Sequence, residues 1–112
     1  HNFTVVYKDP EDAFAAAKEL ARVGGGVTAV ENGAPISTLA LPVAGLMSEL
    51  PVEPLAAKTQ ETEKAIATLC YGKEGMLLKT AVMALACLPC FVMTDKGLFD
   101  GLNSVFLPVF KD

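Results

Sequence analysis

Two short sequence signals enclose a helix near the start of the chain and limit its length. Asp9-Pro10-Glu11-Asp12 places a capping carboxylate before a proline at the first helical position and adds acids to the first turn, where they complement the helix dipole. Gly24-Gly25-Gly26 ends the helix, because glycine tolerates the left-handed conformation of a C-cap. The two signals predict a helix that begins at the proline and ends near Arg22 or Val23.

Strands are predicted on both sides of this helix. Residues 2–8 are β-branched and aromatic with partial alternation, which is typical of a buried first strand. After the glycines, residues 27–31 and 35–41 are apolar-rich runs around Asn32-Gly33, and both of these turn residues tolerate positive φ. These two runs predict a β-hairpin.

The remainder of the chain predicts a second helix followed by extended segments. Ser48 and the prolines and acid that follow it indicate a helix start, and Gly72 indicates its end. From Met76 onward the chain is apolar, and residues 94–97 form a clear turn sequence, so strands are expected before this turn and one or two short extended pieces after it. The inward positions expected for the helix are Leu55, Thr59, Thr62, Ile66 and Leu69.

The predicted fold class is therefore α+β, with a mixed, mainly antiparallel sheet and two helices. The order β-α-β-β-α-β matches the ferredoxin-like pattern, with a C-terminal extended segment added. A length of 112 residues predicts a single domain over residues 1–112. With 52% apolar residues, so small a body is expected to present apolar surface to a partner.

Charge and hydropathy exclude two classes of partner. The net charge is −4 and no block of basic residues occurs, which argues against nucleic acid. Residues 81–93 are uncharged for too short a stretch to span a membrane, which takes about 20 residues, and we interpret them as a buried strand. A polar start and an odd set of three cysteines predict a cytoplasmic, reducing location.

Few residues are candidates for chemistry. His1 is the single histidine, so a metal centre with several histidine ligands cannot be built within the chain. Cys87-Leu88-Pro89-Cys90 is a CxxC motif, which suits half a zinc site or a redox pair, but a second ligand pair is missing and we expect these cysteines, with Cys70, to pack as small buried apolar residues.

Other polar motifs have plain structural interpretations. Gly24-Gly25-Gly26 follows a helix, whereas a phosphate loop precedes one. Asp95 and Asp100 could form a carboxylate pair, yet Asp95 belongs to a turn sequence that favours aspartate on backbone grounds. Lys58, Glu61 and Lys64 are expected to form a solvated helix face with paired charges. The residues alone thus predict a binding, docking or accessory domain with no catalytic residues.

Two stretches give the chain a specific resemblance. Leu41-Pro42-Val43-Ala44-Gly45-Leu46-Met47-Ser48 and Thr94-Asp95-Lys96-Gly97-Leu98-Phe99-Asp100 occur in an order and spacing similar to the C-terminal domain of bacterial adenine deaminase, a member of the amidohydrolase superfamily. The opening of the chain resembles this family as well. The resemblance covers nearly the whole sequence.

The resemblance implies a parent enzyme that hydrolyses adenine to hypoxanthine and ammonia. It implies a metal centre, usually manganese or iron, in an upstream (β/α)₈ barrel of the same polypeptide, with no cofactor bound by this chain. His1 and Asn2 resemble the last two residues of a His-Asp-Ser-His-Asn segment, which makes them candidates for a position near the active site. The expected role is to pack on the barrel, support active-site closure and help subunits assemble into a homo-oligomer, and the isolated chain is expected to be inactive.

Two alternatives remain open. A stand-alone α+β module that binds a small ligand or a partner would explain the architecture but not the two motifs. A thiol redox protein would require Cys87 and Cys90 to be accessible to reagents.

Overall fold

The computed structural model describes residues 3–83, 85 and 87–110, and in this part of the chain it has three helices and two small antiparallel sheets. The chain divides into two compact units, which are described separately. One unit is Val5–Lys79, and the other, as far as it is described, takes in Phe3, Thr4 and the residues from Thr80 onward.

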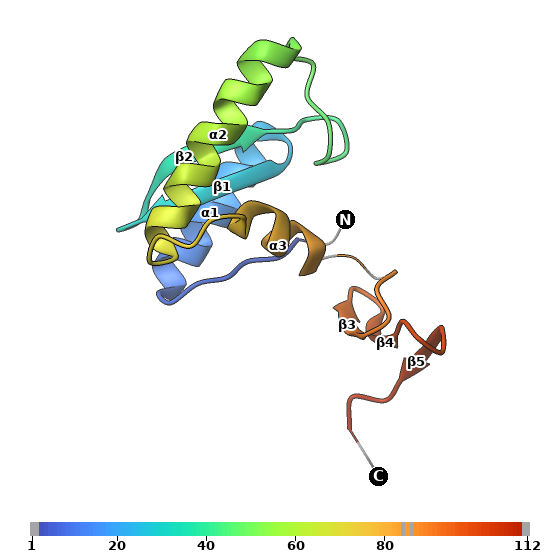
Figure 1. The fold of residues 1–112 in the computed structure, drawn as a ribbon. Helices are drawn as coiled ribbons and strands as arrows, with labels where there is room; N and C mark the ends of the chain where they lie inside the picture. The colour runs from blue at the N-terminus through green and yellow to red at the C-terminus, as the bar shows by residue number, and fades with distance from the viewer. Residues whose placement is uncertain (1–2, 84, 86, 111–112) are drawn as a thin grey trace. The chain divides into compact units, whose positions relative to one another are not determined.

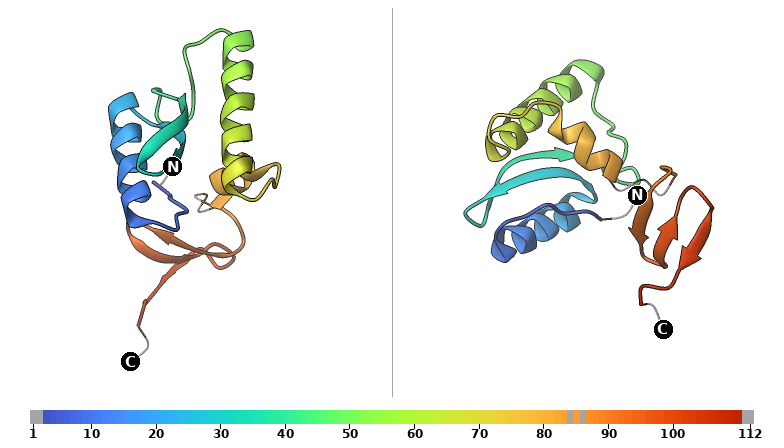
Figure 2. Two further views of the ribbon diagram at one scale, coloured as in Figure 1. Left: turned by 90° about the vertical axis from the view of Figure 1, so that its left-hand side faces the viewer. Right: turned by 60° about the horizontal axis from the view of Figure 1, so that its bottom comes forward.

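The first unit places a two-stranded hairpin between two helices (Figures 1 and 2). Helix α1 (Pro10–Val23) has Asp9 as its N-cap and Gly24 in the left-handed conformation as its C-cap, which confirms both predicted limits. Strands β1 (Gly26–Glu31) and β2 (Ala34–Ala40) form the predicted hairpin, with a register shift between Ala29 and Val30. Helix α2 (Val52–Leu69) covers the opposite face of the hairpin from α1.

The core of this unit is small. Its buried apolar residues are Ala16 on α1, Ala29 on β1 and Leu39 on β2. Among the positions expected to face inward on α2, Thr62 is fully buried, Leu55, Thr59 and Ile66 are half-buried, and Leu69 is exposed. The interface between α2 and the hairpin is therefore centred on a polar side chain.

The second unit contains a three-stranded antiparallel sheet in the order β3-β4-β5. Its strands are β3 (Phe91–Thr94), β4 (Gly97–Asp100) and β5 (Val105–Leu107), and the predicted turn joins the first two. Val92 is its buried apolar residue, and the rings of Phe99 and Phe106 pack with centroids 5.1 Å apart. The extended segments expected around this turn are confirmed.

The α+β class is confirmed, but the single ferredoxin-like sheet is wrong. Residues 3–8 form no strand, and Asn2 lies outside the described residues. The reason is pairing: β1 bonds only to β2 in the described structure, so a β-prone segment before α1 has no neighbouring strand to stabilise it.

A second correction concerns the apolar run that begins at Met76. Its first part is a helix, α3 (Met76–Met83), which crosses the division between the two units, and only Phe91–Thr94 is a strand. The interpretation of residues 81–93 as one buried strand is therefore wrong. Methionine, leucine, lysine and alanine are good helix formers, and periodicity cannot distinguish helix from strand in so short an apolar run.

Candidate functional site

The residues predicted from the sequence to do chemistry do not come together in the described structure. His1 and Asn2 lie outside the described residues, so their position near an active site stays a prediction. Among the residues that are described, no group of three or more His, Cys, Asp or Glu side chains could hold a metal ion. A resident metal therefore does not fit this part of the chain.

The cysteines lie differently from the prediction. All three are free thiols, Cys70 is half-buried, and Cys87 and Cys90 are exposed. The expectation that they pack as buried apolar residues is wrong for the CxxC pair, because residues 87–90 form a turn that leads into β3 and not part of a buried strand.

The glycines after α1 cap the helix and also receive a second loop. Gly24 has φ of 81°, and the Gly25 amide donates to the Leu20 carbonyl oxygen at 2.9 Å, as predicted for a helix end. The Gly25 carbonyl oxygen accepts from the Leu41 amide at 3.0 Å. A Cβ at Gly25 would lie 2.8 Å from the Gly45 Cα, so the close approach of these two backbone segments requires glycine.

The segment that approaches the glycines contains the first resemblance motif, and we call residues 41–50 the motif loop. Ala44 and Gly45 both have positive φ, 58° and 71°, and the Leu46 amide donates to the Val43 carbonyl oxygen at 3.1 Å. These are the features of a type I′ turn. Val43 and Met47 also pair through both of their backbone groups, at 3.2 and 3.1 Å. The loop therefore has a defined backbone.

The motif loop presents apolar side chains to solvent. Exposure is 39% for Val43, 49% for Leu46, 59% for Met47 and 51% for Leu50. A cluster of this kind on a loop with fixed backbone bonds is typical of an interaction surface. We take the motif loop as the candidate functional site.

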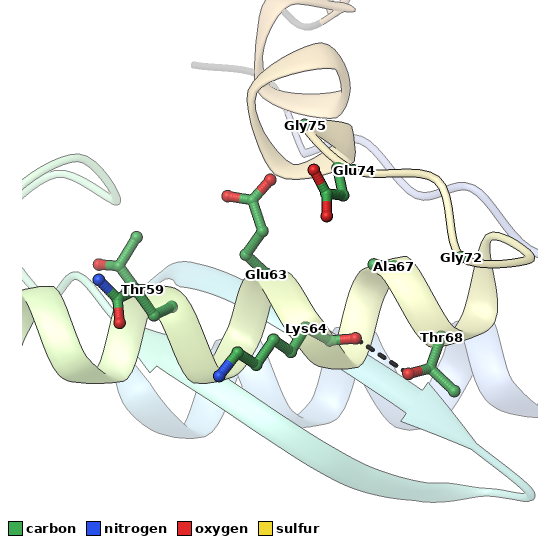
Figure 3. Close-up of a pocket in the computed structure, with 9 residues that line it drawn as sticks. Thr59, Glu63, Lys64, Ala67, Thr68, Gly72, Glu74 and Gly75 are labelled. Carbon is green, nitrogen blue, oxygen red and sulfur yellow. Dashed lines mark hydrogen bonds between the residues drawn. The ribbon is translucent and has the colours of Figure 1, made fainter.

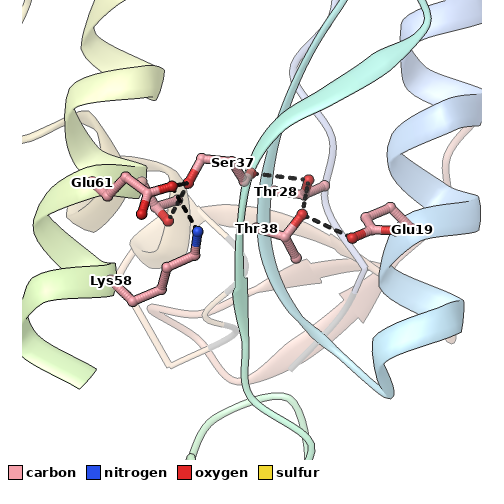
Figure 4. A network of polar contacts seen from close by, with 7 residues as sticks. Glu19, Thr28, Ser37, Thr38, Lys58 and Glu61 are labelled. Carbon is pink, nitrogen blue, oxygen red and sulfur yellow. Dashed lines mark hydrogen bonds and ion pairs between the residues drawn. The ribbon is translucent and has the colours of Figure 1, made fainter. Parts of the chain in front are cut away.

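A polar contact at the centre of the first unit fixes α2 against β2 (Figure 4). The hydroxyl groups of Ser37 and Thr62 are 2.9 Å apart, and the Ser37 hydroxyl also lies 3.0 Å from Glu61 Oε1, to which it donates. Lys58 Nζ lies 2.6 Å from the same carboxylate oxygen, which confirms the predicted charge pair on α2. The hydrogen bond from Lys58, followed by that from Ser37, holds the pKa of Glu61 below its ordinary value.

A matching contact fixes α1 against the other face of the hairpin. Thr28 and Thr38 are direct partners across the two strands, and their hydroxyl oxygens are 2.9 Å apart. Thr38 also donates to Glu19 Oε1 at 3.0 Å, and Arg22 donates to both oxygens of that carboxylate. The hydrogen bonds from Arg22 are the main reason that the pKa of Glu19 lies below its ordinary value. Helical periodicity could have indicated the Glu19–Arg22 pair, but not its contact with the strand. The two networks link both helices to the hairpin, and neither includes a residue of the motif loop.

The second resemblance motif, residues 94–100, takes in the last residue of β3, the turn that follows it and all of β4. The Thr94 hydroxyl donates to the Gly97 carbonyl oxygen at 2.9 Å and accepts from the Lys96 amide at 3.1 Å. Asp100 is buried, and its carboxylate accepts from the Leu102 and Asn103 amides and, at 2.7 Å, from the Asn103 side chain. These hydrogen bonds, with the Asn103 side chain first, hold the pKa of Asp100 below its ordinary value. Asp100 therefore has a structural role.

This sheet carries exposed apolar residues on both faces, since Phe106 shares the face of Val92 and is 54% exposed. Residues opposite each other on paired strands share a face, so Phe91 and Met93 lie with Val105 on the side of the sheet away from Val92. Their exposures are 67%, 61% and 45%. Each unit thus has an apolar surface of its own beside a resemblance motif.

A hollow of about 590 Å³ lies beside the C-terminal half of α2 (Figure 3). The Thr68 hydroxyl donates to the Lys64 carbonyl oxygen at 3.0 Å along one wall. The residues that line the hollow are Thr59, Gln60, Glu63, Lys64, Ala67, Thr68, Gly72, Glu74 and Gly75.

Within the described part of the chain, no helix has the length and hydropathy needed to cross a membrane.

Comparison with known proteins gives one consistent result. Residues 1–104 match the family model of the adenine deaminase C-terminal domain. The chain is 39% identical over 100 residues to an adenine deaminase of Oleidesulfovibrio alaskensis, which covers 89% of the chain and 18% of that relative. It is 34% identical over 112 residues to an adenine deaminase of Clostridium botulinum, all of the chain and 19% of the relative.

The same holds for a protein of Shouchella clausii named adenine deaminase 2, which is 34% identical over 110 residues, or 98% of the chain and 19% of the relative. The chain therefore spans less than a fifth of the length of these curated relatives. No solved structure matches the chain.

Proposed function

The chain belongs to the adenine deaminase C-terminal domain family, and from this premise we propose that it is the accessory domain of an adenine deaminase and docks on the catalytic part. In this proposal residues 1–112 work as a single accessory domain. The parent reaction converts adenine and water to hypoxanthine and ammonia. Manganese or iron would be held by the barrel of the same polypeptide, since no described group of this chain fits a metal.

The observation that carries the proposal is the exposed apolar motif loop. Leu46 and Met47 are exposed on a turn whose backbone is fixed by hydrogen bonds, so little backbone conformational entropy is lost when the loop binds a partner. The relatives are about five times as long as the chain, so a large partner surface is covalently linked to their corresponding domain. An apolar loop of defined shape is well suited to such an intramolecular interface.

Three finer roles belong to the same proposal. The docked domain would support the segments that close over the purine, and it would help further copies of the polypeptide to associate. His1 and Asn2 would lie near the active site of the parent enzyme. The isolated chain would have no deaminase activity.

The test is to supply the catalytic part of the parent enzyme and this chain as separate polypeptides and to measure binding and adenine deamination. Leu46→Asp and Met47→Asp place a charge in the proposed interface and are expected to weaken binding at least about tenfold, because a charge buried without a partner is costly. Tyr71→Asp is the matched control, because Tyr71 is 94% exposed on the same unit, lies outside the motif loop and has a φ of 56° that aspartate tolerates.

Equal binding by the two loop variants and the wild-type chain would exclude the motif loop as the docking surface. Robust metal-dependent deamination by the chain alone would contradict the accessory role. Both results are read from the same preparations, so a failure of docking can be distinguished from a failure of the enzyme.

A stand-alone binding module is the second candidate, and the hollow beside α2 is the observation in its favour. The two functions differ in the size of the native polypeptide. An antibody raised against this chain should detect, in an extract of the source cells, a species several times heavier than 11.8 kDa if the chain is part of an adenine deaminase. A species of 11.8 kDa would favour the stand-alone module.

A further inference from the structure

The CxxC segment of the second unit has no role in the docking proposal. Cys87 and Cys90 are separated by Leu88 and Pro89, and both thiols are free and exposed. We propose that they form a reversible dithiol–disulfide pair that reacts with low-molecular-weight disulfides. This site is independent of the docking function, since it needs neither a catalytic barrel nor adenine.

The backbone between the two cysteines is bent and fixed. The Cys90 amide donates to the Leu88 carbonyl oxygen at 2.8 Å, which closes a γ-turn around Pro89. The chain also bends at each of residues 88–90. A disulfide needs Cα atoms within about 7 Å, and bends at three successive residues shorten the distance between the Cys87 and Cys90 Cα atoms from that of an extended chain.

The same turn is seated against the end of β4. The Gly101 amide donates to the Cys90 carbonyl oxygen at 3.0 Å. A Cβ at Gly101 would overlap the Leu88 carbonyl oxygen, so only glycine lets the turn lie this close to the sheet. The segment between the cysteines is therefore held in place by the sheet, and both cysteines are exposed.

The surroundings favour a redox pair over a metal site. A structural zinc site takes four ligands, and no group of three His, Cys, Asp or Glu residues among those described could supply them. Two exposed thiols with a bend between them suffice for a disulfide, and exposure makes the bond accessible to exchange.

The reaction is balanced by the disulfide that is consumed. The thiolate of one cysteine attacks a sulfur of a small disulfide, forms a mixed disulfide and releases one small thiol. The thiolate of the other cysteine then attacks the protein sulfur of the mixed disulfide, forms the Cys87–Cys90 bond and releases the second small thiol. Two protein thiols are oxidised and one small disulfide is reduced to two thiols.

Tryptic cleavage leaves Cys87 and Cys90 together in one peptide and places Cys70 in another, so the state of the pair can be read by mass. Residues 80–96 contain no internal Lys or Arg and carry both Cys87 and Cys90, whereas Cys70 lies in the peptide of residues 65–73. The full chain is incubated in its native state with oxidised and reduced glutathione in varied ratios, quenched with acid, alkylated and digested. The masses of the two peptides then report each thiol.

The expected product is a peptide of residues 80–96 that carries neither alkyl group nor glutathione and is two hydrogens lighter than its reduced form. Dithiothreitol should restore two alkylatable thiols. Cys70 has no cysteine two or three residues away, so its peptide is expected to show at most a glutathione adduct. This peptide serves as an internal control for nonspecific oxidation.

Two single variants test the Cys87–Cys90 disulfide directly. Cys87→Ser and Cys90→Ser each leave a single thiol in this segment, and both are expected to lose the light peptide completely and to accumulate a glutathione adduct on the remaining cysteine. Because both positions are exposed, at least one variant should keep the wild-type circular dichroism spectrum. The proposal is overturned if the wild-type peptide keeps two alkylatable thiols at every ratio, carries only glutathione adducts, or forms only disulfides between chains.

Discussion

Removal of the hydroxyl group that Thr62 buries between α2 and β2 tests how the first unit is held together. Thr62 is fully buried, and its hydroxyl lies 2.9 Å from that of Ser37. Thr62→Val keeps the side-chain shape and leaves Ser37 bonded to Glu61, so the expected loss is the net value of one hydrogen bond, about 1 kcal/mol. Ser37→Ala instead leaves the buried Thr62 hydroxyl without the Ser37 oxygen, and about 2 kcal/mol is expected.

The two changes together should cost less than their sum. Once Ser37 is alanine and Thr62 is valine, no hydroxyl remains to be desolvated at the contact, so the double variant is expected to lose about 1.5 kcal/mol and not about 3 kcal/mol. Urea unfolding followed by circular dichroism measures each value. At an m-value of about 1.5 kcal/mol per molar, a loss of about 2 kcal/mol lowers the midpoint by about 1.3 M.

Thr68→Val is the matched control on the same helix. The Thr68 hydroxyl is exposed and donates to the Lys64 carbonyl oxygen one turn earlier, so its loss is expected to change the free energy of unfolding by less than about 0.5 kcal/mol. Additive losses for Ser37→Ala and Thr62→Val would refute the reasoning, because independent sites do not share a hydrogen bond. A control loss as large as that of Thr62→Val would also refute it.

Two further changes test the backbone and the acid stability. Gly26→Ala should lower the free energy of unfolding by more than about 3 kcal/mol, because φ is 135° and a Cβ would overlap the Leu39 carbonyl oxygen. Gly33→Ala, which has open space around the new Cβ and a φ of 76°, should cost about 1 kcal/mol in the same urea assay. Equal costs for the two variants would contradict this reasoning. Because hydrogen bonds lower the folded-state pKa of Asp100, its stabilising contribution is present above about pH 4 and is lost as the pH falls through the folded-state pKa. Asp100→Asn should therefore reduce the fall of the urea midpoint at acid pH. An unchanged fall would count against this role of Asp100.

Local signals in the sequence were sufficient where a few neighbouring residues decide the conformation. The cap at Asp9 and the glycine at position 24 set the limits of α1, and Asn32-Gly33 set the hairpin turn, because each acts through its own backbone conformation or an adjacent hydrogen bond. Long-range pairing decided the rest. Residues 3–8 have strand character, but a strand exists only where another strand accepts its hydrogen bonds.

The candidate site shows the same division. The turn at Ala44 and Gly45 lies within a motif that could be quoted from the sequence, but the exposure of Leu46 and Met47 depends on what packs around them. The burial of the CxxC cysteines was predicted wrongly for the same reason: a short apolar run is equally compatible with a buried strand and with a turn that exposes its thiols.

The two resemblance motifs contain residues of two physical kinds, and this separation decides what their substitution means. Gly45 and Asp100 shape the backbone, one through positive φ and the other through hydrogen bonds to the following turn, so their replacement should lower stability. Leu46 and Met47 contribute little to the free energy of unfolding, because about half of each residue's surface remains exposed to solvent. A substitution at Leu46 or Met47 that leaves the urea midpoint unchanged and still weakens docking can therefore be assigned to the interface and not to misfolding.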